Sequence, residues 1–334
     1  MARLKYKCID LFCGAGGMSY GFEMAGFDTV FAVEFNKVYA ESYKLNFFDT
    51  DVYVGDIKEI TDNQIRNILD RNGPVDLIIG GPPCQGFSIA GNIGRKFLDD
   101  PRNRLFKEYV RFVNIIKPKI FVLENVASLV KHNNGKTIRE IIDCFKECGY
   151  DVKYSVLNSV DYNVPQERRR VFIVGTKEGM IFNYPIPINK KITIKEAIDD
   201  LPSLKAGETS DIDLHVAMNH TTQMLEKMKY VKDGGSRNDI PESIRPKSGD
   251  TRKYIRYASW KPSFCVTGDM RKIFHYSQNR ALTCRELARI QTFPDSYKFI
   301  GNTIQIQQQI GNAVPCNLAY EVAKECWRCL KNGK

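Results

Sequence analysis

The sequence predicts an α/β protein with a doubly wound, mostly parallel sheet and a smaller, loop-rich inserted domain. Short apolar runs alternate with helical patterns through the first half of the 334 residues, which is typical of strands joined by crossover helices. That rhythm breaks down from about residue 177 to residue 279, where Pro, Gly and Asp cluster. The length is also ample for two domains.

Seven apolar runs have the length and composition of buried strands. The predicted strands are 7–12, 29–33, 52–54, 75–79, 120–123, 152–157 and 171–175. Apolar residues spaced three and four apart predict helices at 105–116, 137–148, 283–290 and 317–330. Because the last helix is amphipathic, we expect it to dock back on the first domain. The expected division is therefore a first domain 1–178, a small inserted domain 179–279, and a return segment 280–334 that completes the first domain.

The composition is that of a globular protein kept in a reducing compartment. Hydrophobic residues make up 43% of the chain and charged residues 26%. No run of about 18 apolar residues is present, and the first ten residues do not resemble a signal peptide. Ten cysteines without a disulfide-scaffold composition favour free thiols. We therefore expect a cytoplasmic protein without a membrane partner.

Positive charge is concentrated in one stretch of the chain. The formal net charge is +10, and residues 231–280 contribute a surplus of six of those charges. Tyr254, Tyr257, Trp260, Phe264, Phe274 and Tyr276 are interleaved with the basic residues. That mixture suits phosphate contacts and base stacking, although a solvated basic surface would have the same composition.

Three consecutive strand ends carry residues suited to a nucleoside. The first strand leads into a loop with Gly14 and Gly16, the second ends at Glu34, and the third is followed by Asp56. The dinucleotide fingerprint is not met, because Ser19 stands at its third glycine, and no P-loop lysine follows. Glu34 could accept from ribose hydroxyls and Asp56 from the adenine amine. S-adenosylmethionine fits this pattern best, although the glycines alone could form an ordinary tight turn.

The next two strands bring a thiol and a carboxyl to the same edge of the sheet. The fourth strand leads into GPPCQGFS at 81–88, where two prolines stiffen the loop that carries Cys84. The fifth strand ends at Glu124, and the carboxyl ends of strands are where ligands bind in such sheets. A cysteine in this place can also be a small core residue. Cys326 and Cys329 form a lone C-x-x-C pair and the histidines lack ligand spacing, so we expect no metal site.

The order of these and later motifs resembles the DNA (cytosine-5)-methyltransferases of the bacterial restriction–modification type. The resemblance covers nearly the whole chain except the insertion, and implies an S-adenosylmethionine-dependent, Rossmann-like catalytic domain. The matching motifs are DLFCGAGG at 10–17, Glu34, Asp56, GPPCQGFS at 81–88, DPRNRLF at 100–106, ENV at 124–126, QERRR at 166–170, RALTCRELARIQTFPD at 280–295 and QIGNAVP at 309–315.

The resemblance implies a covalent mechanism on a cytosine flipped out of duplex DNA. Cys84 would add to carbon 6 as a thiolate, and Glu124 would share a proton with ring nitrogen 3. Arg168 and Arg170 would hold the cytosine carbonyl oxygen. The base that removes the carbon 5 proton is not assigned. From the residues alone, the QERRR segment could be a solvated charge run ahead of a strand.

The resemblance also implies a donor site for S-adenosylmethionine. Glu34 would hold the ribose, Asp56 the adenine amine, and Asn312 the methionine end. From the residues alone, 311–312 is a turn before the last helix. The expected donor-binding residues are Phe12, Gly14, Gly16, Glu34, Asp56, Ile57, Pro83, Leu105, Asn312 and Val314.

Double-stranded DNA is the expected substrate, and the basic insertion is the expected target-recognition region. The segment 86–104 is either a mobile loop that closes on the flipped base or an ordinary surface loop. The recognition sequence cannot be derived, because side-chain placement in a loop-rich region decides base readout. The residues expected to contact DNA are Gln85, Ser88, Arg95, Arg102, Arg252, Lys253, Arg256, Arg271 and Lys272.

One departure from the family pattern leaves rival interpretations open. Family members often have Pro and then Thr with an aliphatic residue in the insertion, whereas here Pro262 precedes Phe264, Cys265 and Thr267. A transfer-RNA cytosine methyltransferase is therefore one alternative, and a catalytically silent DNA-binding homologue or an enzyme acting on small nucleotides are others. The main interpretation is a monomeric bacterial modification enzyme, with a cognate restriction endonuclease expected from family habit.

Overall fold

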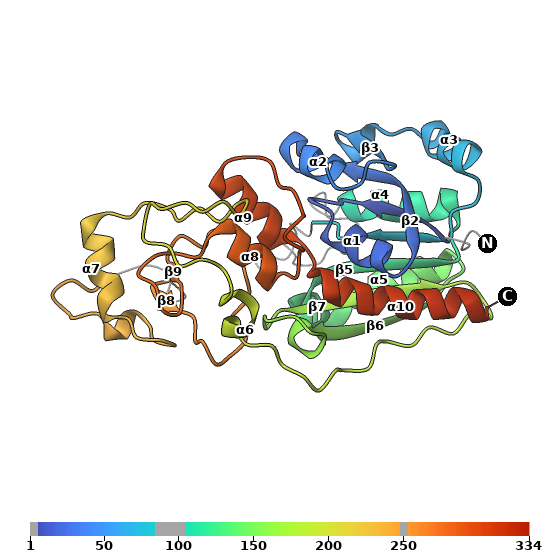
Figure 1. The fold of residues 1–334 in the computed structure, drawn as a ribbon. Coiled ribbons are helices and arrows are strands. Elements are labelled where there is room, and N and C mark those ends of the chain that lie inside the picture. Colours follow the sequence, from blue (N-terminus) through green and yellow to red (C-terminus); the bar gives the residue numbers. More distant parts are fainter. Residues whose placement is uncertain (1–5, 84–103, 248–252, 334) are drawn as a thin grey trace. The chain divides into compact units, whose positions relative to one another are not determined.

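The computed structural model describes residues 6–83, 104–247 and 253–333, which divide into two compact units (Figure 1). The first unit comprises Met1–Asn158, Arg169–Ile186 and Leu318–Lys334, and the second comprises Ser159–Arg168 and Pro187–Asn317. The expected boundaries differ from this division, because 159–168 and 280–317 cluster with the second unit. The side chains of these segments explain the difference: Arg280, for example, is fully buried and pairs with Glu286 at 2.6 Å inside the second unit.

A seven-stranded sheet forms the centre of the first unit. Its spatial order is β3-β2-β1-β4-β5-β7-β6; neighbouring strands are parallel except that β7 runs antiparallel to both β5 and β6. Each predicted strand is present, and the predicted fold class is confirmed. The strands are β1 (Tyr6–Leu11), β2 (Phe27–Glu34), β3 (Asp51–Val54), β4 (Leu77–Gly80), β5 (Ile120–Val126), β6 (Asp151–Asn158) and β7 (Arg169–Thr176).

Helices cover both faces of this sheet, because alternate residues of each strand point to opposite faces. In β1, Ile9 and Leu11 join one core with apolar residues of α3 (Asp62–Asn72), α4 (Arg104–Ile116) and α5 (Lys136–Glu147). Near the start of β1, the ring of Tyr6 meets that of Trp327 on α10 (Cys316–Asn332), at 6.2 Å between centroids.

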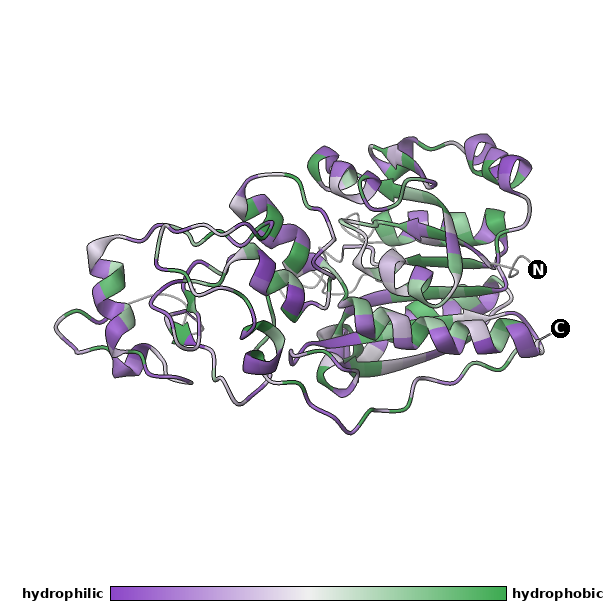
Figure 2. Ribbon diagram, viewed as in Figure 1, coloured by the Kyte–Doolittle hydropathy of each residue, from purple (hydrophilic) through white to green (hydrophobic). Residues whose placement is uncertain are grey.

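Two shorter helices also lie close to the strand ends. They are α1 (Gly17–Met24), directly after the first loop, and α2 (Lys37–Lys44), which follows β2. Figure 2 shows the strands as predominantly hydrophobic and the outer helices as mixed, which is the pattern of a sheet buried between layers.

The second unit is rich in loops, as expected. Its elements are α6 (Ile194–Ile198), α7 (Thr222–Tyr230), β8 (Ile255–Arg256), β9 (Ile273–Phe274), α8 (Cys284–Ile290) and α9 (Thr303–Asn312). The expectation of a mere turn at 311–312 is wrong, because Asn312 is the last residue of α9. This helix begins with a capping box between Asn302 and Gln305, and its run of glutamines hides the apolar period.

None of the helices in the described part of the chain is both long and apolar enough to cross a membrane. The nine cysteines that the structure describes are free thiols, six of them buried.

Candidate active site

The loop after β1 turns sharply and leaves open space beside it. Phe12, Gly14 and Gly16 have φ values of 65°, 57° and 91°, in the left-handed region that only glycine adopts freely. For Phe12 this conformation costs on the order of 1 kcal/mol, and its ring packs at the edge of the core. A Cβ built on Gly14 would meet no atom within 4 Å. The loop therefore has room for a ligand against its backbone.

The carboxylate of Glu34 ties the end of β2 to this glycine loop. Its Oε2 accepts a hydrogen bond from the backbone N–H of Gly14 at 2.9 Å, and its Oε1 accepts one from Asn36 at 2.7 Å. Burial raises the pKa of Glu34, although these backbone hydrogen bonds act in the opposite direction. Two of the predicted strand ends are thus in direct contact, with remaining acceptor capacity on the carboxylate.

Asp56 lies just beyond β3, where it caps the short 3-10 helix Ile57–Glu59. Its carboxylate accepts from the backbone N–H of Lys58 at 3.1 Å and pairs with the Lys58 ammonium at 2.8 Å. Burial alone would raise the pKa of Asp56, but these contacts with Lys58 lower it overall. Ile57 is buried in the core beneath this turn.

An exposed aromatic residue that the sequence reasoning missed stands next to Glu34. Phe35 follows the end of β2 directly and is 75% exposed, which is unusual for a large apolar side chain. Its position after the acidic strand end could have identified it, since nucleosides bind between apolar faces and a few polar groups.

The carboxyl of Glu124 packs against the segment that leads to Cys84. A Cβ built on Gly81 would lie 2.9 Å from Glu124 Oε2, so an added methyl group would have to displace the carboxylate. The neighbouring Asn125, which is buried, donates from Nδ2 to the carbonyl oxygen of Pro82 at 3.0 Å. The segment after β4 and the end of β5 are therefore joined by direct contacts. Cys84 itself lies outside the described residues.

Arg170 completes this group through an ion pair. Its Nε lies 2.9 Å from Glu124 Oε1, and both side chains are largely buried. The antiparallel register places Arg170 opposite Val126 on β5, which brings the guanidinium to the carboxylate two residues away. A second guanidinium nitrogen, NH1, donates to the carbonyl oxygen of Arg169 at 2.8 Å. One oxygen of Glu124 thus faces a fixed positive charge and the other faces the Gly81 segment.

Arg168 belongs to the second unit, where it is buried in a set of backbone contacts. Its NH1 donates to the carbonyl oxygen of Val266 at 3.1 Å and approaches the Cys265 sulfur at 3.2 Å. Its NH2 lies 3.4 Å from the carbonyl oxygen of Asn312. Arg168 and Asn312, which the resemblance links to different ligands, are therefore in contact.

The remaining donor-site candidates are found in different surroundings. In the first unit, Pro83 is exposed, and Leu105 lies in the first turn of α4, partly buried against the core. In the second unit, the side chain of Asn312 is exposed, and Val314 is buried.

Two of the expected DNA contacts pair with one acid in the second unit, and a third lies over an aromatic ring. Asp269 Oδ2 lies 3.1 Å from Lys253 Nζ, and Asp269 Oδ1 lies 2.8 Å from Arg271 Nε. These contacts, led by that with Arg271, lower the pKa of Asp269 despite some burial. Lys272 lies over the ring of Tyr254 at 5.1 Å. We call Lys253, Arg271 and Lys272 the basic cluster.

The expectation that Arg256 contacts DNA is not supported by its surroundings. Its guanidinium is buried and donates to the carbonyl oxygens of four residues and to the side chain of Asn279. A guanidinium saturated in this way holds loops together and cannot reach a phosphate. The carbonyl partners are Met228, Val231, His275 and Gln278. The other expected DNA contacts, Gln85, Ser88, Arg95, Arg102 and Arg252, lie outside the described residues.

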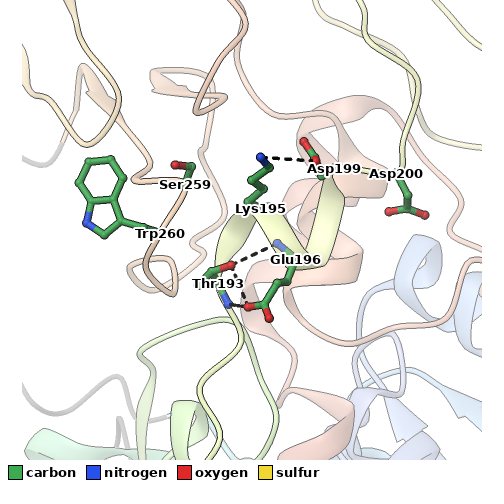
Figure 3. A pocket seen from close by; sticks show the side chains of 7 residues that line it. All are labelled: Thr193, Lys195, Glu196, Asp199, Asp200, Ser259 and Trp260. Carbon is green, nitrogen blue, oxygen red and sulfur yellow. Dashed lines mark hydrogen bonds and ion pairs between the residues drawn. The ribbon is translucent and has the colours of Figure 1, made fainter.

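An open hollow of about 590 Å³ in the second unit contains none of the expected site residues (Figure 3). Trp260 and Ser259 lie across from α6, whose first turn is fixed by the Thr193–Glu196 capping box. Acidic side chains outnumber Lys195 along its wall, which disfavours a phosphate ligand. The lining residues are Thr193, Lys195, Glu196, Asp199, Asp200, Ser259 and Trp260. Among the described residues, no group of three or more His, Cys, Asp or Glu could hold a metal ion.

Comparison with known proteins identifies the class to which this fold and site belong. The model of the C-5 cytosine-specific DNA methylases matches residues 6–328. The type II methyltransferase M1.HphI of Haemophilus parahaemolyticus is 57% identical over 95% of this chain and 85% of its own. M.DdeI of Desulfomicrobium norvegicum is 36% identical over 95% and 87%.

A solved structure named as a DNA modification methyltransferase of an Escherichia coli prophage has the same fold. Its TM-score is 0.81 at 24% identity, covering 98% of this chain and all of that one. The chain belongs to the C-5 cytosine-specific DNA methylase family. It is an S-adenosylmethionine-dependent DNA cytosine-5 methyltransferase of the type found in bacterial restriction–modification systems.

Proposed function

We propose that this enzyme methylates carbon 5 of one cytosine in a specific double-stranded DNA sequence, through a flipped base and a covalent bond to Cys84. The observation that carries the mechanism is the position of Glu124, whose carboxyl packs against Gly81 and pairs with Arg170. A carboxyl held between the cysteine-bearing segment and a guanidinium is suited to act on one ring while the thiolate attacks it.

The proposal assigns a task to each of the four catalytic residues. The Cys84 thiolate forms a bond to carbon 6 of cytosine, and the displaced electron pair is stabilised as Glu124 shares a proton with nitrogen 3. Arg170 holds the Glu124 carboxylate in place and, with Arg168, polarises the carbonyl oxygen of the ring. After methylation, loss of the carbon 5 proton to an unassigned base expels Cys84 as the thiolate.

The donor would be held at the carboxyl ends of the first strands, and S-adenosylmethionine supplies an electrophilic methyl group there when bound. The open space at Gly14 and the adjoining turn at Gly16 fit a ligand that approaches the backbone closely. We assign the ribose to Glu34, the adenine amine to Asp56, and one face of the adenine to Phe35. Phe12, Ile57, Pro83 and Leu105 would provide apolar contacts, and Asn312 and Val314 would contribute from the second unit.

We assign DNA backbone contacts to the basic cluster and to the basic residues of the segment 84–103. Removing a base from the duplex stack costs a few kcal/mol, which phosphate contacts must offset. We further propose that the enzyme acts in the bacterial cytoplasm, binds DNA as a monomer, and protects sites cut by a cognate restriction endonuclease.

The direct test uses tritiated S-adenosylmethionine with purified enzyme. Mixed-sequence duplex DNA and total transfer RNA are offered in parallel, and the methylated base is identified after digestion. We expect 5-methylcytosine in DNA alone, abolished by Cys84→Ala and strongly reduced by Glu124→Gln. Label in transfer RNA alone would overturn the proposed substrate. Methylation retained by Cys84→Ala would overturn the covalent mechanism.

A further inference from the structure

Two glutamines form a buried amide pair in the second unit. Gln166 Nε2 donates to Gln291 Oε1 at 2.7 Å, and both side chains are fully buried. They are 125 residues apart in sequence: Gln166 belongs to the QERRR segment, and Gln291 follows α8 directly. The pair therefore joins the QERRR motif at 166–170 to the motif at 280–295, to which the proposed function assigns no role.

The other amide group of each glutamine forms hydrogen bonds with the backbone of a different segment. Gln166 Oε1 accepts from the N–H of Val266 at 2.8 Å. Gln291 Nε2 donates to the carbonyl oxygens of Ile310 and Ala313, at 2.5 and 3.2 Å. Carbonyl oxygens only accept, so the orientation of Gln291, and through it that of Gln166, is fixed. The result is a chain of hydrogen bonds that runs in one direction across four segments of the chain.

The guanidinium of Arg168 binds the same two segments that the amides hold. It donates to the carbonyl oxygen of Val266, whose N–H binds Gln166, and to that of Asn312, which lies between the two carbonyl partners of Gln291. We propose that Gln166 and Gln291 are positioning residues that fix Arg168 and the Ile310–Ala313 segment in one shared geometry. The cytosine-holding arginine and the donor-holding Asn312 are thereby coupled. This inference rests on the proposed roles of Arg168 and Asn312.

The coupling predicts a specific kinetic signature. A change at Gln291 disturbs both ligands, so it raises the KM for S-adenosylmethionine and also lowers kcat. A role confined to packing lowers stability without moving either parameter at temperatures where the protein remains folded.

In the full-length enzyme, Gln291→Glu should raise the KM for S-adenosylmethionine and lower kcat to an extent that depends on pH. An ionised carboxylate repels the carbonyl oxygens of Ile310 and Ala313, whereas the protonated acid donates to one of them. At pH 8 we expect kcat/KM to fall about 10- to 100-fold, the range for small displacements of positioned groups. The ratio of variant to wild-type activity should recover toward pH 6.

Ile290→Ala is the matched control, because Ile290 is fully buried in the adjacent position but makes none of these hydrogen bonds. It should lower the melting temperature while leaving kcat and both KM values near wild type. Calorimetric titration with S-adenosylhomocysteine adds a readout without DNA, in which Gln291→Glu should weaken binding and Ile290→Ala should not.

Two further variants decide the question if Gln291→Glu fails to fold. Gln166→Glu keeps the acceptor for Val266 but, when ionised, replaces the donor to Gln291 by a negative charge. Gln291→Met removes the hydrogen bonds without introducing a charge. Both variants should raise the KM for S-adenosylmethionine and lower kcat. Gln291→Met should not recover activity at low pH. Kinetics equal to those of Ile290→Ala would overturn the coupling while leaving the proposed function intact. Absence of methyl transfer by the wild-type enzyme would instead remove the proposed function.

Discussion

Glu124 is confined on both sides, by Gly81 and by Arg170, so the smallest addition at Gly81 must displace it. The sequence motifs identified Glu124 and the GPPC segment, but nothing in the sequence shows that a Cβ at Gly81 would come within 2.9 Å of the carboxylate.

We expect Gly81→Ala to lower kcat at least tenfold, because a shifted Glu124 no longer meets the ring in the required geometry. Steady-state methylation assays and thermal unfolding check this result. Gly179→Ala is the control: its φ of +81° makes alanine strained, yet no atom lies within 4 Å of the added Cβ. It should lose about 1 kcal/mol of stability with unchanged kcat. Equal kcat in both variants would contradict the prediction.

Asp10 gives a second prediction at this scale. It is fully buried on β1 and accepts from Ser19 Oγ at 2.5 Å, and burial raises its pKa from 3.8 to about 7. The folded state therefore favours the protonated acid, and this contribution to stability is lost as pH rises from about 4 through 7. Asp10→Asn should remove that loss and be more stable than wild type at pH 8, with a smaller difference at pH 4. Urea unfolding at pH 4 and pH 8 measures the difference in stability between the variant and wild type. An equal difference at the two pH values would contradict the prediction.

Single residues also mark what the sequence could not reveal. Charge and position suggested Arg256 as a DNA contact, but its burial depends on loops that meet only in the folded chain. Phe35 was missed for the opposite reason: an aromatic residue after a strand normally predicts burial, and its exposure is a property of the tertiary structure.

At the scale of elements, local periodicity was sufficient for the strands and for the four helices that the sequence predicted. It could not give the antiparallel direction of β7, which depends on the crossing from β6 rather than on the residues of the strand. Nor could it give α9, where glutamines occupy the positions that apolar residues would mark. The direction of a strand and the formation of a polar helix both depend on residues that are distant in the sequence.

The segments around β8 and β9 contain two arginines for which we expect different effects on DNA binding. Replacing Arg271 by Gln should weaken binding to any duplex and reduce the slope of log K against log salt by about 0.9. Arg256→Lys should instead leave that slope unchanged and lower stability, because a lysine cannot replace the five contacts of the buried guanidinium. Fluorescence anisotropy over a range of KCl concentrations, with urea unfolding, checks both. If the salt slope changed in Arg256→Lys and not in the Arg271 variant, Arg256 rather than Arg271 would be the phosphate contact.

At the scale of the whole molecule, one chain carries each residue that the proposed reaction names. We therefore expect a mass near 38.2 kDa in free solution and one enzyme per duplex carrying a single site. Sedimentation velocity with a short fluorescent duplex, at several protein concentrations, measures both. A free dimer, or two chains per single-site duplex, would contradict the monomer proposal.

Neither unit is continuous in sequence, which has a consequence for how the chain is made. Helix α10 belongs almost entirely to the first unit, where Trp327 lies against Tyr6 and Cys326 is fully buried, yet the whole of 187–317 precedes it along the chain. During translation the first unit thus lacks one of its covering layers until the second has emerged from the ribosome. The start of β1 stays uncovered for that interval, so a chaperone that binds nascent apolar surface would find it there.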